Sequence, residues 1–191
     1  MTPQRKYRFD QAARTHLALA LLALCVFSLA GGAARAQGVA DAARTAEVAR
    51  VVLGIVSYVR WPAPHAELQM CVLGEARHAD ALLDNQGGPG ARLRARRLGA
   101  GGPAPVLADC QVAYIGALAE AEREKFFTQL IGRPILVISE PIVPCSVANM
   151  FCLTFRDAQV TFDVNLDAIA RSGLRVHPNA LRIAKRPAPQ P

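Results

Sequence analysis

The side chains best suited to chemistry in this chain are its cysteines. Cys71, Cys110, Cys145 and Cys152 follow an apolar N-terminal stretch that contains the fifth, Cys25. No two of them have the Cys-x-x-Cys spacing that favours a redox-active couple, and no histidine lies at zinc-finger spacing from a cysteine pair. Four cysteines outside that stretch favour structural disulfides, while a redox-sensing thiol and a metal site are the weaker alternatives.

The other polar residues form no known catalytic motif. The sequence contains no Gly-x-Ser-x-Gly turn, no Gly-x-x-x-x-Gly-Lys phosphate loop and no His-Glu-x-x-His pair. We expect His65, His78 and His177 at the surface, because each falls in a loop-like context. Asp163 and Asp167 straddle a strand end and a helix start, where Asp167 interacts with the helix dipole. The residues therefore favour a protein that is not an enzyme and needs no cofactor, with a thiol enzyme as the weakest alternative.

The first 36 residues have the pattern of a cleavable signal peptide. A basic start precedes the apolar residues 17–30, and Ala34-Arg35-Ala36 supplies a small-x-small cleavage site. This apolar stretch is shorter than the roughly 20 residues of a membrane-spanning helix, so an uncleaved anchor is the weaker alternative. Bulky Leu24 before Cys25 disfavours a lipid anchor. We expect export through a Sec-type signal with cleavage near Ala36, into a compartment where disulfides persist.

The leader holds most of the excess positive charge. The whole chain has a formal net charge of +7, but residues 1–36 carry five of its 22 Lys and Arg residues and one of its 15 Asp and Glu residues, leaving a net charge near +3. This small charge argues against a nucleic-acid partner. We expect residues 37–186 to form a single α/β domain and residues 187–191 to be a disordered tail.

Apolar periodicity predicts a three-layer α/β sandwich. Helices are expected over residues 41–60, 79–84, 119–131 and 166–172 and from residue 178, and strands over 68–73, 91–98, 110–115, 135–139, 150–155 and 160–164. Their alternation favours a mixed, partly parallel sheet of about five to six strands flanked by helices. The last two strands are spaced as an antiparallel hairpin, with helices after it. Residues 100–105 are expected to form a loop.

Local signals mark the ends of several elements. Asp41 and Asn165 are expected as N-caps, and Gly132 and Gly173 as the left-handed residues that follow a helix. Trp61-Pro62 is expected to end the first helix.

The strand over residues 91–98 alternates between arginine and apolar side chains. Arg92, Arg94 and Arg96 share one face, as in a half-exposed strand. An edge strand protected by charge is the favoured interpretation, and an anion-binding strip is the alternative.

This layout favours one of the three possible disulfide pairings. Cys71 and Cys110 lie on two predicted buried strands that can be neighbours, while Cys145 precedes the first hairpin strand and Cys152 lies within it. We therefore expect Cys71–Cys110 and Cys145–Cys152. Chain entropy gives about 4 kcal/mol for the first link and about 2.5 kcal/mol for the second.

Several basic and polar residues near the two ends of the domain are candidates for binding a partner or ligand. Arg60, Arg171, Arg175 and His177 are candidates for a shared basic pocket, with polar contacts from Ser146 and Asp163 and an aromatic contact from Trp61. Such a pocket suits a small anion or an amino-acid-like ligand. Solvated helix-end arginines are the favoured interpretation, and a partly buried core position is an equal alternative for Trp61.

Two motifs occur together in this chain. The first is Val51-Val-Leu-Gly-Ile-Val-Ser-Tyr-Val-Arg-Trp-Pro62, and the second is Val160-Thr-Phe-Asp-Val-Asn-Leu-Asp-Ala-Ile-Ala-Arg-Ser-Gly-Leu-Arg-Val-His-Pro178. With the four-cysteine framework, they resemble the YfiR family of small periplasmic proteins over about Ala43 to Lys185. The Gly/Pro-rich region from Gln86 to Pro105 fits the family pattern poorly, so nothing is carried over there.

The resemblance implies a periplasmic regulator. Proteins of this family repress a diguanylate cyclase of the inner membrane by binding its periplasmic sensor domain. An outer-membrane lipoprotein with a peptidoglycan-binding domain can sequester the repressor, after which cyclic di-GMP rises and favours biofilm formation. The family's disulfides match the expected pairing, and envelope stress acting through Cys145–Cys152 is a further hypothesis. A homodimer is compatible with the resemblance, and a periplasmic small-ligand-binding protein is the alternative function.

Overall fold

The computed structural model describes residues 37–84, 93–99, 104–141, 145, 148–156 and 159–185. The expected leader, the tail at 187–191 and Ser146 lie outside the described residues. The chain divides into two units, residues 1–42 and 43–191, and residues 37–42 of the first are helical. Within the described ranges, no helix combines the length and apolar character that a membrane crossing requires. The following description concerns the second unit.

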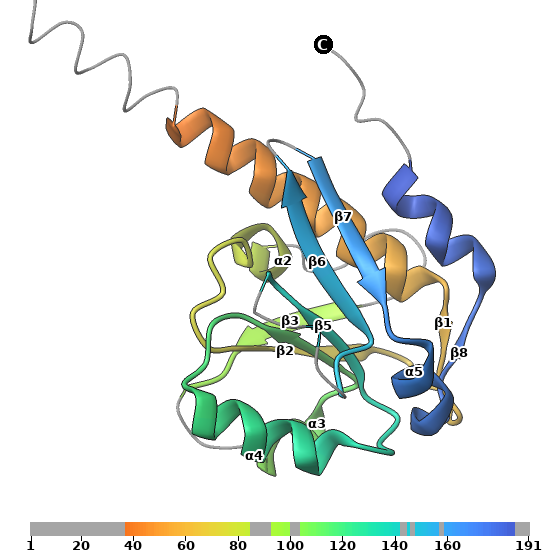
Figure 1. Cartoon of the computed structure of the whole chain (residues 1–191). Coiled ribbons are helices and arrows are strands. Elements are labelled where there is room, and N and C mark those ends of the chain that lie inside the picture. The colour runs from red at the N-terminus through yellow and green to blue at the C-terminus, as the bar shows by residue number, and fades with distance from the viewer. Residues whose placement is uncertain are drawn as a thin grey trace, which may run out of the picture. The chain divides into compact units, whose positions relative to one another are not determined.

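A six-stranded mixed sheet forms the centre of this unit (Figure 1). Its strands are β2 (Leu68–Leu73), β3 (Leu93–Arg97), β4 (Val112–Ile115), β5 (Leu136–Ser139), β6 (Phe151–Arg156) and β7 (Gln159–Val164). They lie in the order β3-β2-β4-β5-β6-β7. Neighbours are parallel from β3 to β6, and β7 is antiparallel to β6. The mixed sheet and the hairpin predicted from the sequence are confirmed.

Helices cover both faces of the sheet. They are the N-terminal helix (residues 43–57 of this unit), α2 (Asp80–Asp84), α3 (Ala104–Asp109), α4 (Glu120–Leu130), α5 (Leu166–Ser172) and the 3-10 helix η1 (Pro178–Lys185). Successive strand residues point to opposite faces. Met70 accordingly packs in the core with the N-terminal helix, while Cys71 packs in a second core with α3 and α4. Two cores on one sheet confirm the expected three-layer sandwich.

The parallel part of the sheet changes direction between β2 and β4. The chain runs from β2 outward to β3 and then returns to place β4 on the other side of β2. Open α/β sheets bind ligands at the carboxyl ends of the strands beside such a switch point. Here backbone hydrogen bonds join the segments that follow β2 and β4, because Glu75 N–H donates to the Ala117 carbonyl and Gly116 N–H to the Leu73 carbonyl, both at 2.9 Å. A Cβ on Gly116 would overlap the backbone of Glu75 and Ala76.

The end of the N-terminal helix differs from the prediction. The helix stops at residue 57, and β1 (Val59–Arg60) then pairs with β8 (Arg175–Val176) in a separate antiparallel ribbon. Helical periodicity continues through Arg60 in the sequence, but pairing with a distant strand overrides it. The N-cap predicted at Asp41 is also wrong, because residues 37–40 before it are already helical.

The sequence prediction missed α3. Residues 100–105 were expected to form a loop, whereas Ala104–Asp109 is helical and β4 begins only at Val112. The Gly/Pro-rich composition hid this short helix. Pro105 is compatible with it, because proline is tolerated in the first turn, where its missing N–H has no helical partner.

Other element ends agree with the prediction. The Asn165 side chain accepts a hydrogen bond from Ala168 N–H at 3.0 Å and so caps α5. Gly132 after α4 and Gly173 after α5 have φ angles of 75° and 78°. Both are left-handed, a conformation that favours glycine. Each end of the two helices therefore lies within one residue of its predicted position.

The arginine-bearing strand β3 lies at an edge of the sheet, as predicted. Each of its arginines pairs with a carboxylate: Arg94 with Glu67 at 2.8 Å, Arg96 with Asp109 at 2.7 Å and Arg97 with Asp80 at 3.3 Å. Arg92 lies outside the described residues. Because the three described arginines of β3 are already paired with carboxylates, the structure gives no support to the alternative of an anion-binding strip.

Both predicted disulfides are present. Cys71–Cys110 joins buried β2 to the segment that leads into β4, with a Cα–Cα distance of 5.9 Å. Cys145–Cys152 joins the segment before the hairpin to β6, with a Cα–Cα distance of 5.8 Å. The first link therefore holds two neighbouring strands of the sheet together, and the second closes a loop at the start of the hairpin.

Candidate functional site

A surface pocket of about 530 Å³ lies where the β1–β8 ribbon meets the end of the N-terminal helix. Its lining contains two arginines, a histidine and a tyrosine among smaller residues: Ser57, Tyr58, Arg60, Arg175, Val176, His177, Pro178 and Asn179. The pocket therefore joins residues from both ends of the domain, from the first sequence motif and from the second. Ribbon pairing produces this proximity.

Two arginines give the pocket its charge. Arg60 and Arg175 are Cα partners in the ribbon, so both belong to the same pair of strands. The Arg60 guanidinium is held in place, because one of its nitrogens donates to the Ser57 and Val59 carbonyls, each at 3.0 Å. Within the described part of the chain, neither arginine forms an ion pair. The pocket is therefore cationic.

His177 adds a fixed donor. Its backbone N–H donates to the Tyr58 carbonyl at 2.9 Å, and its ring stacks against Tyr58 with centroids 6.0 Å apart. Ring atom Nδ1 accepts a hydrogen bond from Asn179 N–H at 3.1 Å. In the neutral ring the proton must then lie on Nε2, where it can be donated to a ligand.

Not all of the residues expected at a shared pocket line it. Arg60, Arg175 and His177 do, whereas Arg171 does not. Arg171 pairs with Asp167 one turn earlier on α5, at 2.5 Å, and the left-handed Gly173 ends the helix before Arg175.

Of the other two polar candidates, the structure describes only Asp163. Asp163 is exposed on β7, as the Cα partner of Cys152, and does not line it. Ser146 lies outside the described residues.

Trp61 is half-buried and directly follows the pocket residue Arg60 in the sequence, but it does not line the pocket. Its ring packs against the core that contains the N-terminal helix, and its indole N–H donates to the Gln111 carbonyl at 3.3 Å. Gln111 in turn joins β2 and β5, through Gln69 and Leu136. Trp61 therefore links the end of β1, and with it the β1–β8 ribbon, to the six-stranded sheet.

The pocket offers donors and positive charge. The Ser57 hydroxyl already donates to the Gly54 carbonyl at 2.7 Å, and the guanidinium groups and the His177 ring supply N–H donors to the pocket. Guanidinium groups bind carboxylates and phosphates through paired, charge-assisted hydrogen bonds. The arrangement suits recognition of an anionic group. In the residues that the structure describes, no group of three or more His, Cys, Asp or Glu side chains could hold a metal ion.

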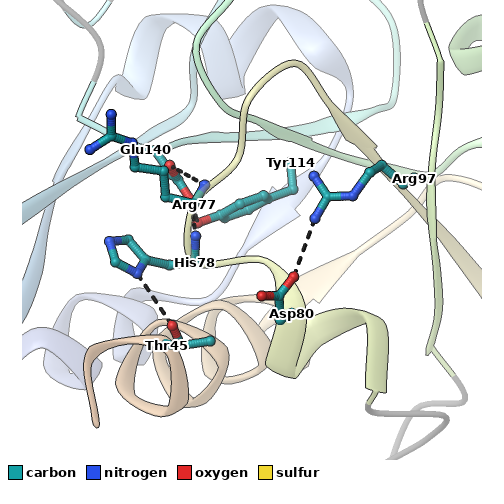
Figure 2. Close-up of polar contacts among 7 residues, drawn as sticks. All are labelled: Thr45, Arg77, His78, Asp80, Arg97, Tyr114 and Glu140. Carbon is teal, nitrogen blue, oxygen red and sulfur yellow. Dashed lines mark hydrogen bonds and ion pairs between the residues drawn. The ribbon is translucent and has the colours of Figure 1, made fainter. Parts of the chain in front are cut away.

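A second polar cluster, buried at the carboxyl ends of the strands, was not predicted (Figure 2). Glu140 follows β5 and accepts hydrogen bonds from the Tyr114 hydroxyl at 3.0 Å, from His78 N–H at 2.8 Å and from Arg77 N–H at 3.1 Å. Burial, and then the charge of Glu140 and its hydrogen bond, raise the pKa of Tyr114 well above its ordinary value. Tyr114 therefore stays a donor at physiological pH.

The expectation of a surface His78 is wrong. This residue is 8% exposed, its ring packs edge-on against Phe155 with centroids 5.0 Å apart, and Nδ1 lies 3.3 Å from the Thr45 hydroxyl. A polar partner on the N-terminal helix makes its burial possible. The one sequence signal for the cluster is a charged residue, Glu140, directly after the most apolar predicted strand.

The fold and the pocket define a disulfide-linked, three-layer α/β protein with an open cationic pocket. A family model described as YfiR/HmsC-like matches residues 45–185, which include both disulfides and all the pocket residues. The chain belongs to the YfiR/HmsC-like family, as its two motifs suggested.

Proposed function

We propose that this protein is a periplasmic regulator that represses a diguanylate cyclase of the inner membrane by binding the cyclase's periplasmic sensor domain. Repression lowers cyclic di-GMP in the cytoplasm and so limits biofilm formation. The observation that carries the proposal is the YfiR/HmsC-like match over residues 45–185. It spans the described domain from the N-terminal helix to η1.

Two further observations support the periplasmic location. The chain forms two disulfides, which persist in oxidising compartments and are rare in the cytosol. Its first 36 residues also contain, in this sequence order, the basic, apolar and small-x-small segments of a secretory signal.

The cationic pocket is the surface that we assign to the partner. Arg60 and Arg175 are exposed and have no carboxylate partner among the described residues, so a partner's acidic side chain can reach them without displacing an internal ion pair. Arginine is enriched at the centres of protein interfaces. Trp61 contributes by holding β1 in place. An outer-membrane, peptidoglycan-binding lipoprotein that takes up the repressor, or stress that reduces a disulfide, would relieve repression.

The test measures cellular cyclic di-GMP with the gene present, deleted, and restored. Deletion should raise cyclic di-GMP, and a copy with its signal peptide should reverse the rise. A copy without residues 1–36 should not, because it stays in the cytoplasm. A restored copy carrying Arg60→Ala and Arg175→Ala should fold but repress poorly. An unchanged cyclic di-GMP level on deletion, with the cyclase expressed, contradicts the proposal.

A small-ligand-binding role is the second candidate, and the pocket itself favours it. A volume of about 530 Å³ is large enough for a small anion or an amino acid. The two roles separate in a binding experiment on the purified protein alone. A ligand should raise the melting temperature without any partner protein, and the rise should grow with ligand concentration.

A further inference from the structure

Glu140 is a buried carboxylate that forms no ion pair with any residue that the structure describes. The residue is 6% exposed. Three hydrogen bonds stabilise it instead. Figure 2 shows the Tyr114 hydroxyl and the backbone of Arg77 and His78 converging on its two oxygens. Burying a carboxylate without such donors costs several kcal/mol, so this site depends on their convergence.

Two of these donors belong to one short segment, residues 74–79, which we call the strap. The strap leaves β2 and lies across the carboxyl ends of β2 and β4. Glu75 exchanges two backbone hydrogen bonds with Ala117, at 2.9 and 3.2 Å. Gly74 has a positive φ of 66°, and a Cβ there would overlap the Ala117 carbonyl. The strap therefore covers the carboxyl ends of β2 and β4 at the switch point of the sheet.

The groups that hold Glu140 are those of an anion site. Successive backbone N–H groups that point to one place bind anions, and here Arg77 and His78 supply such a pair. Fully buried Tyr114 adds a hydroxyl donor from β4. We propose that the strap closes an oxyanion-binding crevice between β2 and β4, and that the Glu140 carboxylate occupies this crevice as a built-in ligand. The inference does not depend on the proposed regulatory role.

The His78 side chain also connects the strap to two other elements of the fold. His78 contacts Thr45 of the N-terminal helix and the Phe155 ring of β6. Because Glu140 belongs to the same chain as its three donors, its carboxylate meets them at a high effective concentration, and an external carboxylate must compete with it. The crevice can accept an external oxyanion only when the Glu140 carboxylate is absent or withdrawn.

Glu140→Ala tests this directly, because it removes the built-in carboxylate and leaves the three donors. Purified from the periplasm, the variant should melt below the wild type, and acetate should raise its melting temperature by at least about 2 °C more than that of the wild type. Adding Tyr114→Phe to the variant should weaken this rescue, because one of the three donors is lost. Equal acetate effects on the wild type and Glu140→Ala overturn the proposal.

A second variant keeps the proposal testable if Glu140→Ala does not fold. Glu140→Gln preserves volume but places an NH2 group against donors. Hydrogen exchange at the amides of Arg77 and His78 should accelerate at least tenfold, while the amides of β4 stay protected. Unchanged exchange at the strap shows that Glu140 does not hold it. Loss of protection throughout the sheet shows a role in the whole fold. Either result overturns the proposal.

Discussion

Arg60 and Arg175 lie directly opposite each other as Cα partners in the β1–β8 ribbon. Like charges at opposed positions destabilise a strand pair. Neither arginine has an ion-pair partner in the part of the chain that the structure describes, so the cost is not offset there. The ribbon brings together two positive charges that an anion can neutralise, whether the anion is a small molecule or a partner's carboxylate.

Phosphate should therefore stabilise the protein through this pair. We expect the melting temperature of the wild type to rise with phosphate at constant ionic strength, and Arg175→Gln to weaken phosphate binding about tenfold or more, because a hydrogen bond to a charged group contributes about 1.5–3 kcal/mol. Arg94→Gln removes the same charge from an arginine that pairs with Glu67, and serves as the matched control. An equal loss in both variants would assign the effect to overall charge.

The two disulfides should differ in their contribution to stability. Replacing Cys71 and Cys110 with alanine should cost about 4 kcal/mol, and replacing Cys145 and Cys152 about 2.5 kcal/mol, because the first link closes the longer loop. Their sequence separations are 39 and 7 residues. The free energy of unfolding in guanidinium measures both costs.

The two double variants are matched, since each replaces the two cysteines of one disulfide. Cys71 is fully buried and Cys145 is exposed, so lost packing adds to the first cost as well. A larger cost for Cys145 and Cys152 would show that the shorter link stabilises the fold by something other than chain entropy.

Much of the fold could be predicted because it depends on local patterns. Strand β2 has the expected bounds, since an apolar run from Leu68 ends at Gly74, which takes a left-handed φ. Asn165 and Gly173 bound α5 through contacts within a few residues of themselves. Val59–Arg60 could not be predicted as a strand, because its partner β8 lies at the other end of the domain and local periodicity favours a helix.

The candidate site could be predicted only in part. Arg60, Arg175 and His177 stood out because each lies in a recognised motif, and the structure groups them in one pocket. Arg171 does not join them, because the left-handed Gly173 ends α5 between Arg171 and Arg175. The role of Glu140 could not be predicted, since two of its partners are backbone N–H groups, which leave no mark in the sequence.

Trp61 should contribute more to stability than to recognition. Trp61→Phe keeps an aromatic ring against the core but removes the hydrogen bond to the Gln111 carbonyl, and we expect a loss of about 1 kcal/mol. Binding of the cyclase sensor domain should change little, whereas Arg60→Ala should weaken it. Circular dichroism must follow unfolding, because Trp61 is the only tryptophan. Loss of binding in Trp61→Phe with an intact fold would instead place the ring at the interface.

Tyr114 should make the protein lose stability in alkali. Burial and the neighbouring Glu140 raise its pKa in the folded state above the ordinary value of about 10. Above that pH, the unfolded chain releases the phenolic proton while the folded protein keeps it. The stability that Tyr114 contributes by keeping its proton is therefore fully present below about pH 10. Above that pH, this group lowers the free energy of unfolding by about 1.4 kcal/mol per pH unit.

Tyr114→Phe isolates this effect, because phenylalanine has no proton to lose. At neutral pH the variant should be less stable than the wild type by about 1 kcal/mol, since Glu140 loses one donor. Between about pH 10 and 12 the difference should shrink and then reverse, because only the wild type carries the additional alkaline loss. Urea unfolding at several pH values measures both. Parallel pH curves for the two proteins would show that Tyr114 does not hold its proton in the folded state.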